Sequence, residues 1–159
     1  MVKAVIAGFA ELPGRSYPDT PLAALHAEAA RAALADSGLA FADVDGYLCA
    51  GDAPGIGPLS MVEYMGLAVR HVNATDIGGA AYHNHLVEAV AAIEAGSCEV
   101  ALITCAGRTR SAPRQTPYHP QPAQPEWPFA AGLGLQTVVP YALMAARYVN
   151  EYGAAPHML

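Results

Sequence analysis

The sequence predicts an α/β fold with a largely parallel sheet. Apolar runs that suit strands alternate with longer segments of helical spacing, an order typical of crossover units. Residues 100–105 form a continuous apolar run, as in strands buried on both faces of a parallel sheet. Of the 159 residues, 53% are hydrophobic and 14% are charged, against about 25% charged in typical proteins. This composition excludes a disordered chain or a coiled coil, and the net charge of −6 argues against a nucleic-acid partner.

The first predicted elements are a strand and a helix. Residues 2–8 form an apolar run that ends at a glycine and suits a buried strand. Asp19 or Thr20 is the predicted N-cap of the helix, with Pro21 near its first position. The Asp-Ser-Gly sequence at 36–38 predicts the end of that helix.

Two further strand and helix pairs are predicted up to residue 105. Residues 44–49 suit a second strand, and residues 61–67 suit a short helix after a loop rich in Gly and Pro. Residues 69–74 suit a third strand, which residues 79–95 follow as a helix. Because that helix has almost no polar face, we expect it to be buried all round. The strand at 100–105 completes the series.

The composition changes after residue 105. Six of the 13 prolines lie between Pro113 and Pro128, and no helical or strand period is found there. A helix is predicted again over residues 138–152. The resulting division is an α/β half at 1–105, a Pro/Arg-rich loop excursion at 106–137 and a continuing helix at 138–159.

The cysteines and the apolar surface bear on location and assembly. The three cysteines show no CxxC spacing, so neither a zinc site nor a disulfide framework is indicated, and a reducing cytoplasm is expected. Residues 127–146 carry no charge, but the prolines and glycines among them argue against a membrane span. So apolar a chain is expected to form a homodimer or to meet a missing partner segment.

Three stretches resemble the N-terminal half of the thiolase superfamily, closest to the branch related to the thiolase part of sterol carrier protein x, also labelled lipid-transfer or acetyl-CoA acetyltransferase-like. They are AVIAGFAELPGRS, LHAEAARAALADSGLAFADVDGYL and GGAAYHNHLVEAVAAIEAGSCEVALITCAGRTRS. The resemblance implies an α/β/α/β/α layered fold with a mostly parallel mixed sheet and a buried central helix. It also implies a homodimer that acts on acyl-CoA, with coenzyme A only as part of the substrate and no covalent cofactor. The C-terminal half, with other active-site residues, is then expected beyond these 159 residues or on another chain. The alternative is that the 159 residues form a complete doubly wound domain.

The resemblance places a nucleophilic cysteine at the start of the central helix, where this sequence has none. Cys98 and Cys105 lie elsewhere and are expected to be small buried hydrophobes. The turn of Gly78, Gly79 and Ala80 still offers amide groups for an oxyanion or a thioester carbonyl. Thiolase-like relatives without the cysteine act as retro-aldol lyases, often with an OB-fold companion protein.

Tyr82 and His83 are the candidate catalytic residues in the same turn and helix. Histidine can transfer protons near neutral pH, and a tyrosine can donate to a developing oxyanion. The alternative is that both fill space and bond to backbone carbonyls. No metal site is expected, because His83 and His85 are two residues apart and point to different faces of a helix.

Arg108, Arg110 and Arg114 are the candidate residues for the phosphates of coenzyme A, since the resemblance places the start of the CoA-covering loop here. Guanidinium groups stay charged and bind oxygens in pairs. The alternative is that they are solvated. Two functions follow: an acyl-CoA enzyme that breaks or forms carbon–carbon bonds, either acyltransferase-like or retro-aldol, or a non-catalytic subunit that binds acyl-CoA or lipid or supports a partner.

Overall fold

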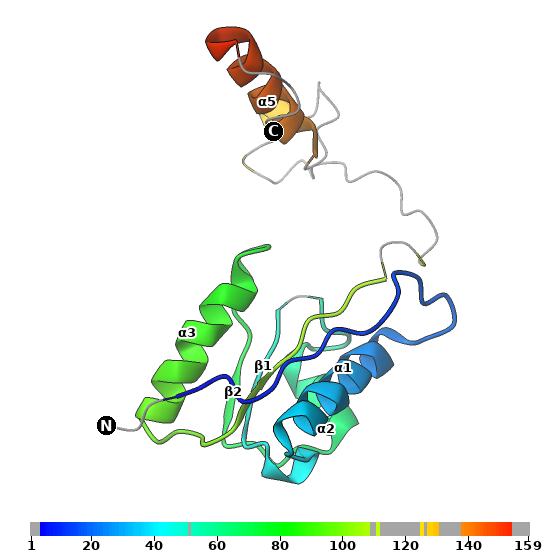
Figure 1. Cartoon of the computed structure of the whole chain (residues 1–159), viewed down its shortest axis with the longest axis vertical. Coiled ribbons are helices and arrows are strands. Elements are labelled where there is room, and N and C mark those ends of the chain that lie inside the picture. The colour runs from blue at the N-terminus through cyan, green and yellow to red at the C-terminus, as the bar shows by residue number, and fades with distance from the viewer. Residues whose placement is uncertain are drawn as a thin grey trace. The chain divides into compact units, whose positions relative to one another are not determined.

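The computed structural model describes residues 4–50, 52–108, 111, 125, 127–130 and 138–153. The chain divides into two compact units, Met1–Ala112 and Pro113–Leu159. The first unit holds a sheet with helices on both of its sides, and the described residues of the second form two helices (Figure 1).

The sheet of the first unit has three strands, all parallel. They are β1 (Gly46–Leu48), β2 (His71–Asn73) and β3 (Ala101–Ile103), in the order β2-β1-β3. Gly46 stands opposite His71 on one side and Ala101 on the other. A Cβ added at Gly46 would lie 2.8 Å from the Cys98 sulfur, so this position of the central strand requires glycine. The prediction of an α/β fold with a parallel sheet is confirmed.

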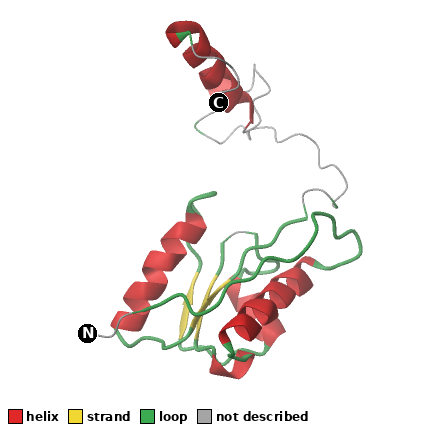
Figure 2. Ribbon diagram, viewed as in Figure 1, coloured by secondary structure: helices red, strands yellow, loops and turns green. Residues whose placement is uncertain are grey.

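Three longer helices cover this sheet. They are α1 (Leu22–Ser37), α2 (Pro58–Met65) and α3 (Ala81–Glu94), and a short 3-10 turn, η1 (Phe41–Asp43), precedes β1. Figure 2 shows α3 on one side of the strands and α1 and α2 on the other. The helix α1 ends at Gly38, which adopts φ +75° as the predicted stop requires. Its N-cap is Pro21, without a side-chain cap, rather than Asp19 or Thr20.

The core between α1, α2 and the sheet is apolar and contiguous. Tyr47 and Met61 are completely buried within it. The other buried members of this core are Ala30, Leu34, Val44, Cys49, Ala53, Leu67 and Leu102. Because Tyr47 brings a hydroxyl into this interior, the core also positions one polar group below the sheet edge.

The predicted strand at residues 2–8 is wrong over the residues that can be compared, since residues 4–10 form no strand. Val5, Ile6 and Phe9 are each at least three-quarters exposed. The segment instead lies against α1, where the Phe9 amide donates to Asp36 Oδ2 at 3.0 Å. The apolar composition suits a strand, but residues 4–10 pair with neither outer edge of the sheet, that of β2 or that of β3.

The helix α3 is buried on one face only, whereas the sequence predicted burial all round. Its inner face carries His85 and three alanines, and Leu86, Val87 and Val90 are exposed on the outside. The difference arises because one sheet packs on this helix, and only on its small-residue face.

The second unit contains α4 (Trp127–Ala130) and α5 (Val138–Tyr152). The bounds of α5 agree with the predicted helix at 138–152. Within α5, the Arg147 guanidinium pairs with Glu151 one turn later, at 3.2 Å. In the part of the chain that the structure describes, no helix combines the length and the apolar character needed to cross a membrane.

Candidate functional site

The carboxyl ends of β1 and β3 define the edge of the sheet where a site is expected. The chain passes from β1 to β2 on one side and then crosses back to β3 on the other side of β1. This reversal is a topological switch point, and ligands of open parallel sheets bind outside the carboxyl ends of the strands at such points. The loops that follow β1 and β3 therefore carry the candidate residues.

Asp52, in the loop after β1, is the centre of a polar cluster at this edge. Its carboxylate accepts a hydrogen bond from the Tyr82 hydroxyl in the first turn of α3. It also accepts the amide hydrogen of Ala106, just after β3, at 2.7 Å. The ring of His26, from α1, places Nε2 3.4 Å from Asp52 Oδ2. We call His26, Tyr47, Asp52, Tyr82 and Thr104 the Asp52 cluster.

The inner part of the cluster is a buried chain of hydrogen bonds. The Thr104 hydroxyl lies 2.8 Å from His26 Nδ1 and 2.7 Å from the Tyr47 hydroxyl. The exposed fractions of His26 and Tyr47 are 0% and that of Thr104 is 3%, so solvent does not share these bonds. This series of hydrogen bonds therefore fixes the orientation of the His26 imidazole.

The contact with Asp52 fixes the tautomer of His26. A nitrogen lone pair that faced a carboxylate would be repelled, so Nε2 carries the hydrogen and Nδ1 accepts from Thr104. Thr104 in turn accepts from Tyr47. At 3.4 Å the Nε2–H dipole faces the carboxylate charge without forming an aligned hydrogen bond, because Nε2 has no hydrogen-bond partner among the described residues.

Burial keeps the partners of Asp52 uncharged. It lowers the pKa of His26 despite the nearby Asp52 charge, so the imidazole is neutral at neutral pH. Burial, together with the hydrogen bonds to Asp52 and Cys105, raises the pKa of Tyr82. Burial also raises the pKa of Tyr47, and it raises the pKa of Cys49 to about 11. Among the described residues, the partners of the Asp52 carboxyl thus bear no positive charge.

The two predicted catalytic residues have different surroundings. Tyr82 belongs to the Asp52 cluster and its ring meets His85 edge-on, with centroids 5.6 Å apart. His83 is exposed, and no hydrogen bond of its side chain is found within the described ranges. His85, whose ring is buried, bonds through Nε2 to the Thr75 carbonyl at 3.0 Å.

The predicted oxyanion turn lies at the surface. Gly78, Gly79 and Ala80 are all exposed, and Gly78 adopts φ +70°. The Gly78 amide donates to Asp76 Oδ1 at 3.2 Å, and the Gly78 carbonyl accepts from Ala81 at 3.0 Å. A Cβ at Gly78 or Gly79 would meet no atom within 4 Å, so open space surrounds both glycines.

Of the three predicted arginines, the structure describes Arg108. Its Nη1 donates to the Thr20 carbonyl at 3.0 Å, which ties the loop after β3 to the residues before α1. The Ser111 hydroxyl strengthens this tie by accepting the Tyr17 amide hydrogen. Arg110 and Arg114 lie outside the described residues.

The cysteines agree with the prediction in part. Cys98 is 1% exposed, as expected of a small buried hydrophobe. The same prediction is wrong for Cys105, which is exposed because it follows Thr104 beyond the end of β3. The Cys105 thiol is instead a neighbour of the Tyr82 hydroxyl. Within the described parts of the chain, no three His, Cys, Asp or Glu residues are grouped to hold a metal ion.

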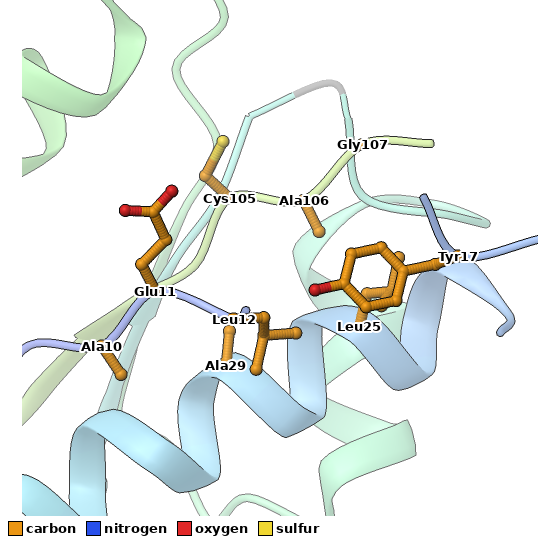
Figure 3. Close-up of a pocket in the computed structure, with 9 residues that line it drawn as sticks. All are labelled: Ala10, Glu11, Leu12, Tyr17, Leu25, Ala29, Cys105, Ala106 and Gly107. Atoms are coloured by element: carbon orange, nitrogen blue, oxygen red, sulfur yellow. The ribbon is translucent and has the colours of Figure 1, made fainter. Parts of the chain in front are cut away.

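A cavity of about 210 Å³ lies beside the cluster (Figure 3). Cys105 and Ala106 belong to its wall, and Ala106 also bonds to Asp52. Figure 3 shows the Glu11 carboxylate and the Cys105 thiol projecting to the same side, and Tyr17 at the other end. The remaining wall is formed by Ala10, Leu12, Leu25, Ala29 and Gly107. The cavity is therefore a space with both apolar and polar lining, next to a polar cluster.

Sequence reasoning missed His26, Tyr47, Asp52 and Thr104. Three of them carry a signal that is visible in the sequence. His26 interrupts an apolar helix face, Asp52 is the only charged residue in the Gly/Pro-rich loop 51–58, and Thr104 follows a run of apolar strand residues. The polar residues that follow parallel strands would have found Asp52 and Thr104.

Comparisons with known proteins give one informative result. No family model matches the chain, and no curated protein matches it. Solved structures do match, among them one named "Ltp2-ChsH2(DUF35) aldolase". The sequences are 29% identical, the TM-score is 0.70, and the match covers 96% of this chain. The chain spans 39% of the length of that aldolase chain.

The similarity is to an aldolase, over almost the whole chain. This similarity agrees with the α/β architecture. It also agrees with retro-aldol cleavage, one of the two types of reaction expected from the sequence. The name of that solved structure joins two protein names, which points to an assembly of two proteins in it.

Proposed function

We propose that the protein carrying this chain cleaves a carbon–carbon bond of an acyl-CoA thioester by a retro-aldol reaction. The observation that carries the proposal is the similarity to an aldolase across 96% of the chain at 29% identity. The sequence supports it because no cysteine stands at the start of α3 to form an acyl-enzyme. Within this proposal the fold is thiolase-like, of the branch related to sterol carrier protein x, with its second half outside these 159 residues.

The reaction needs protein groups in three roles. A base must take the proton of a hydroxyl group two carbons from the thioester carbonyl. Hydrogen-bond donors must hold the thioester oxygen, because charge develops there when the carbon–carbon bond breaks. Cationic side chains are suited to the phosphates of coenzyme A. We assign the binding of the thioester oxygen to the turn Gly78–Ala80. We assign the binding of the phosphates to the arginines at 108, 110 and 114.

The Asp52 cluster and the adjacent cavity support the remaining role, the proton transfer from the substrate hydroxyl. The cavity is lined mainly by apolar side chains and suits a hydrocarbon part of the substrate. The cluster lies at its end, next to Cys105 and Ala106. Of the two predicted catalytic residues we retain Tyr82 in proton transfer, because it contacts the cluster and His83 does not.

The proposed assembly is a homodimer that also binds a companion protein with an OB-fold. The exposed Leu86, Val87 and Val90 on α3 support burial by another surface. The two-part name of the similar aldolase supports a companion protein. The acyl-CoA class and both partners are proposals for the whole protein, of which this chain covers a part.

The proposed function is tested by assaying the protein with and without its companion against two sets of CoA thioesters. We expect 3-hydroxyacyl-CoA substrates to release an aldehyde or ketone and a shortened acyl-CoA, measured by chromatography. We expect no thiolysis of 3-ketoacyl-CoA by free coenzyme A. Thiolysis without carbonyl release would overturn the retro-aldol assignment. Binding of acyl-CoA without turnover of either set would replace it with the non-catalytic subunit.

A further inference from the structure

We propose that Asp52 is the proton acceptor of this site, and that Tyr82 passes to it the proton of a substrate hydroxyl. The inference rests on the proposed function for the identity of the substrate, a 3-hydroxyacyl thioester. It assigns the base of the reaction to residues within this chain, at the carboxyl ends of β1 and β3.

The contact between Tyr82 and Asp52 gives the direction of the transfer. The Tyr82 hydroxyl donates its hydrogen to Asp52 Oδ1, so the phenolic oxygen has lone pairs for a second donor. The side chain of Tyr82 is only partly buried. A substrate hydroxyl that donates to this oxygen is joined to the Asp52 carboxylate through a single side chain.

Asp52 is held in place by uncharged groups. The Ala106 amide fixes Oδ2 at 2.7 Å, and the neutral ring of His26 backs the same oxygen. No Lys or Arg nitrogen lies within 4.0 Å of this carboxylate among the described residues. The side chain is 23% exposed, so the carboxylate is not sealed from solvent.

The buried hydrogen bonds explain how this arrangement is maintained. The Tyr47–Thr104–His26 chain turns the imidazole so that its N–H faces Asp52. His26 is therefore a positioning residue, since it touches the carboxylate and not the substrate. The 3.4 Å separation leaves Asp52 free of a strong bond on that side.

The step balances in protons and electron pairs. The proton of the substrate hydroxyl moves to the Tyr82 oxygen while the Tyr82 proton moves to Asp52 Oδ1. The electron pair of the broken O–H bond forms the carbonyl of the leaving aldehyde or ketone. The pair of the broken carbon–carbon bond moves to the α-carbon and gives the thioester enolate. The enolate then takes a proton from water, and Asp52 releases its proton to water.

The test compares three variants of the protein with its companion present. Asp52→Asn keeps the shape of the side chain and removes its charge, and Tyr82→Phe keeps the ring and removes the hydroxyl. Asp36→Asn is the matched control, because this exposed carboxylate also accepts one backbone amide, that of Phe9. We expect kcat to fall about 100-fold or more in the first two variants, the usual range of acid–base catalysis. KM is expected to change less than about threefold, and the control to keep its kcat.

A structural role for Asp52 is separated by chemical rescue. In Asp52→Ala, formate is expected to restore cleavage in proportion to its concentration, whereas chloride at equal ionic strength is not. Loss of kcat without rescue by formate would make Asp52 structural and overturn the proposal. An unchanged kcat in Asp52→Asn would do the same. If Asp52→Asn fails to fold by circular dichroism, Tyr82→Phe decides, and an unchanged kcat overturns the transfer through Tyr82.

The outcome also distinguishes this inference from the proposed function. A wild-type protein that cleaves 3-hydroxyacyl-CoA, with active Asp52→Asn and Tyr82→Phe variants, would overturn the pair and keep the retro-aldol reaction. A wild-type protein that cleaves none of these thioesters would overturn the proposed function, and the proton transfer with it.

Discussion

Two aspartates on either side of β1 have opposite environments. Asp45 precedes the strand, and its carboxylate accepts the amides of Glu99 and Val100, both at 2.8 Å. It also binds the Arg70 guanidinium at 2.6 and 3.0 Å. Asp52 follows the strand and also collects groups from distant segments, but all of its partners are uncharged.

The two edges of the sheet differ in the charge of the groups that contact their aspartates. Partial burial opposes ionisation of Asp45, but the Val100 and Glu99 amides and the Arg70 charge outweigh it, so the pKa of Asp45 is lowered. Asp45 thereby joins the amino ends of the three strands. At the carboxyl edge, Asp52 has no Lys or Arg nitrogen within 4.0 Å among the described residues and lies beside a cavity. The amino edge thus carries a charged network that stabilises the sheet, whereas the carboxyl edge is where ligands of open parallel sheets bind.

Replacing Asp45 should have the largest effect on stability. Asp45→Ala removes the acceptor of two backbone amides and of Arg70, and these amides are left without their partner. Hydrogen bonds to charged groups contribute about 1.5–3 kcal/mol when they are well buried, and solvent screening at this exposed edge reduces the contributions of both amides and of Arg70. We expect a loss of about 2 kcal/mol in the free energy of unfolding, measured with urea, and an unchanged kcat of the folded protein.

The control and the pH dependence sharpen this prediction. Asp43→Ala removes an exposed carboxylate that accepts only the Ala40 amide, and it should cost less. Because the pKa of Asp45 is lowered on folding, its contribution is present above the unfolded value near pH 3.9 and is lost as pH falls through the folded pKa. The wild type should therefore lose stability below about pH 4 more steeply than Asp45→Ala. Equal acid slopes would contradict the assigned network.

His26 should give an intermediate effect at the other edge. Burial lowers its pKa, so between the folded pKa and about 6.5 the unfolded chain binds more protons than the folded one. The free energy of unfolding should therefore rise with pH through this window. Lowering the pH from 7.5 to 5.5 should reduce it by up to about 1 kcal/mol. Urea unfolding at both pH values checks this. His26→Asn should flatten the dependence, and the exposed control His83→Asn should leave it unchanged; a flat wild-type profile would contradict a neutral buried His26.

The fold could be predicted where local signals decide the structure. The glycine stop of α1, the strand β1 and the bounds of α5 all follow from caps and periodicity. The segment 2–8 was predicted as a strand because its composition suits one. A strand also needs a neighbouring strand to pair with, and residues 4–10 pair with none of the three strands. No local pattern contains that information.

The candidate site could be predicted only in part, for a related reason. Tyr82 was found because it lies at the start of a recognisable helix. His26 and Thr104 are 78 residues apart in sequence, and Asp52 and Ala106 are 54 apart. Their proximity arises from the crossover of the chain from β2 to β3. The sequence shows each of these polar residues, but only the strand order shows that they meet.

The smallest effect is expected for His83, which the sequence pairs with Tyr82. Adjacent residues of a helix project about 100° apart, so Tyr82 can reach Asp52 while His83 is exposed. We expect His83→Ala to change the free energy of unfolding by less than about 0.5 kcal/mol. Its kcat, measured by carbonyl release, should stay near the wild-type value, whereas Tyr82→Phe loses activity. A tenfold fall in kcat for His83→Ala would instead assign proton transfer to His83, which lies outside the Asp52 cluster, and would contradict the role given to Tyr82 and Asp52.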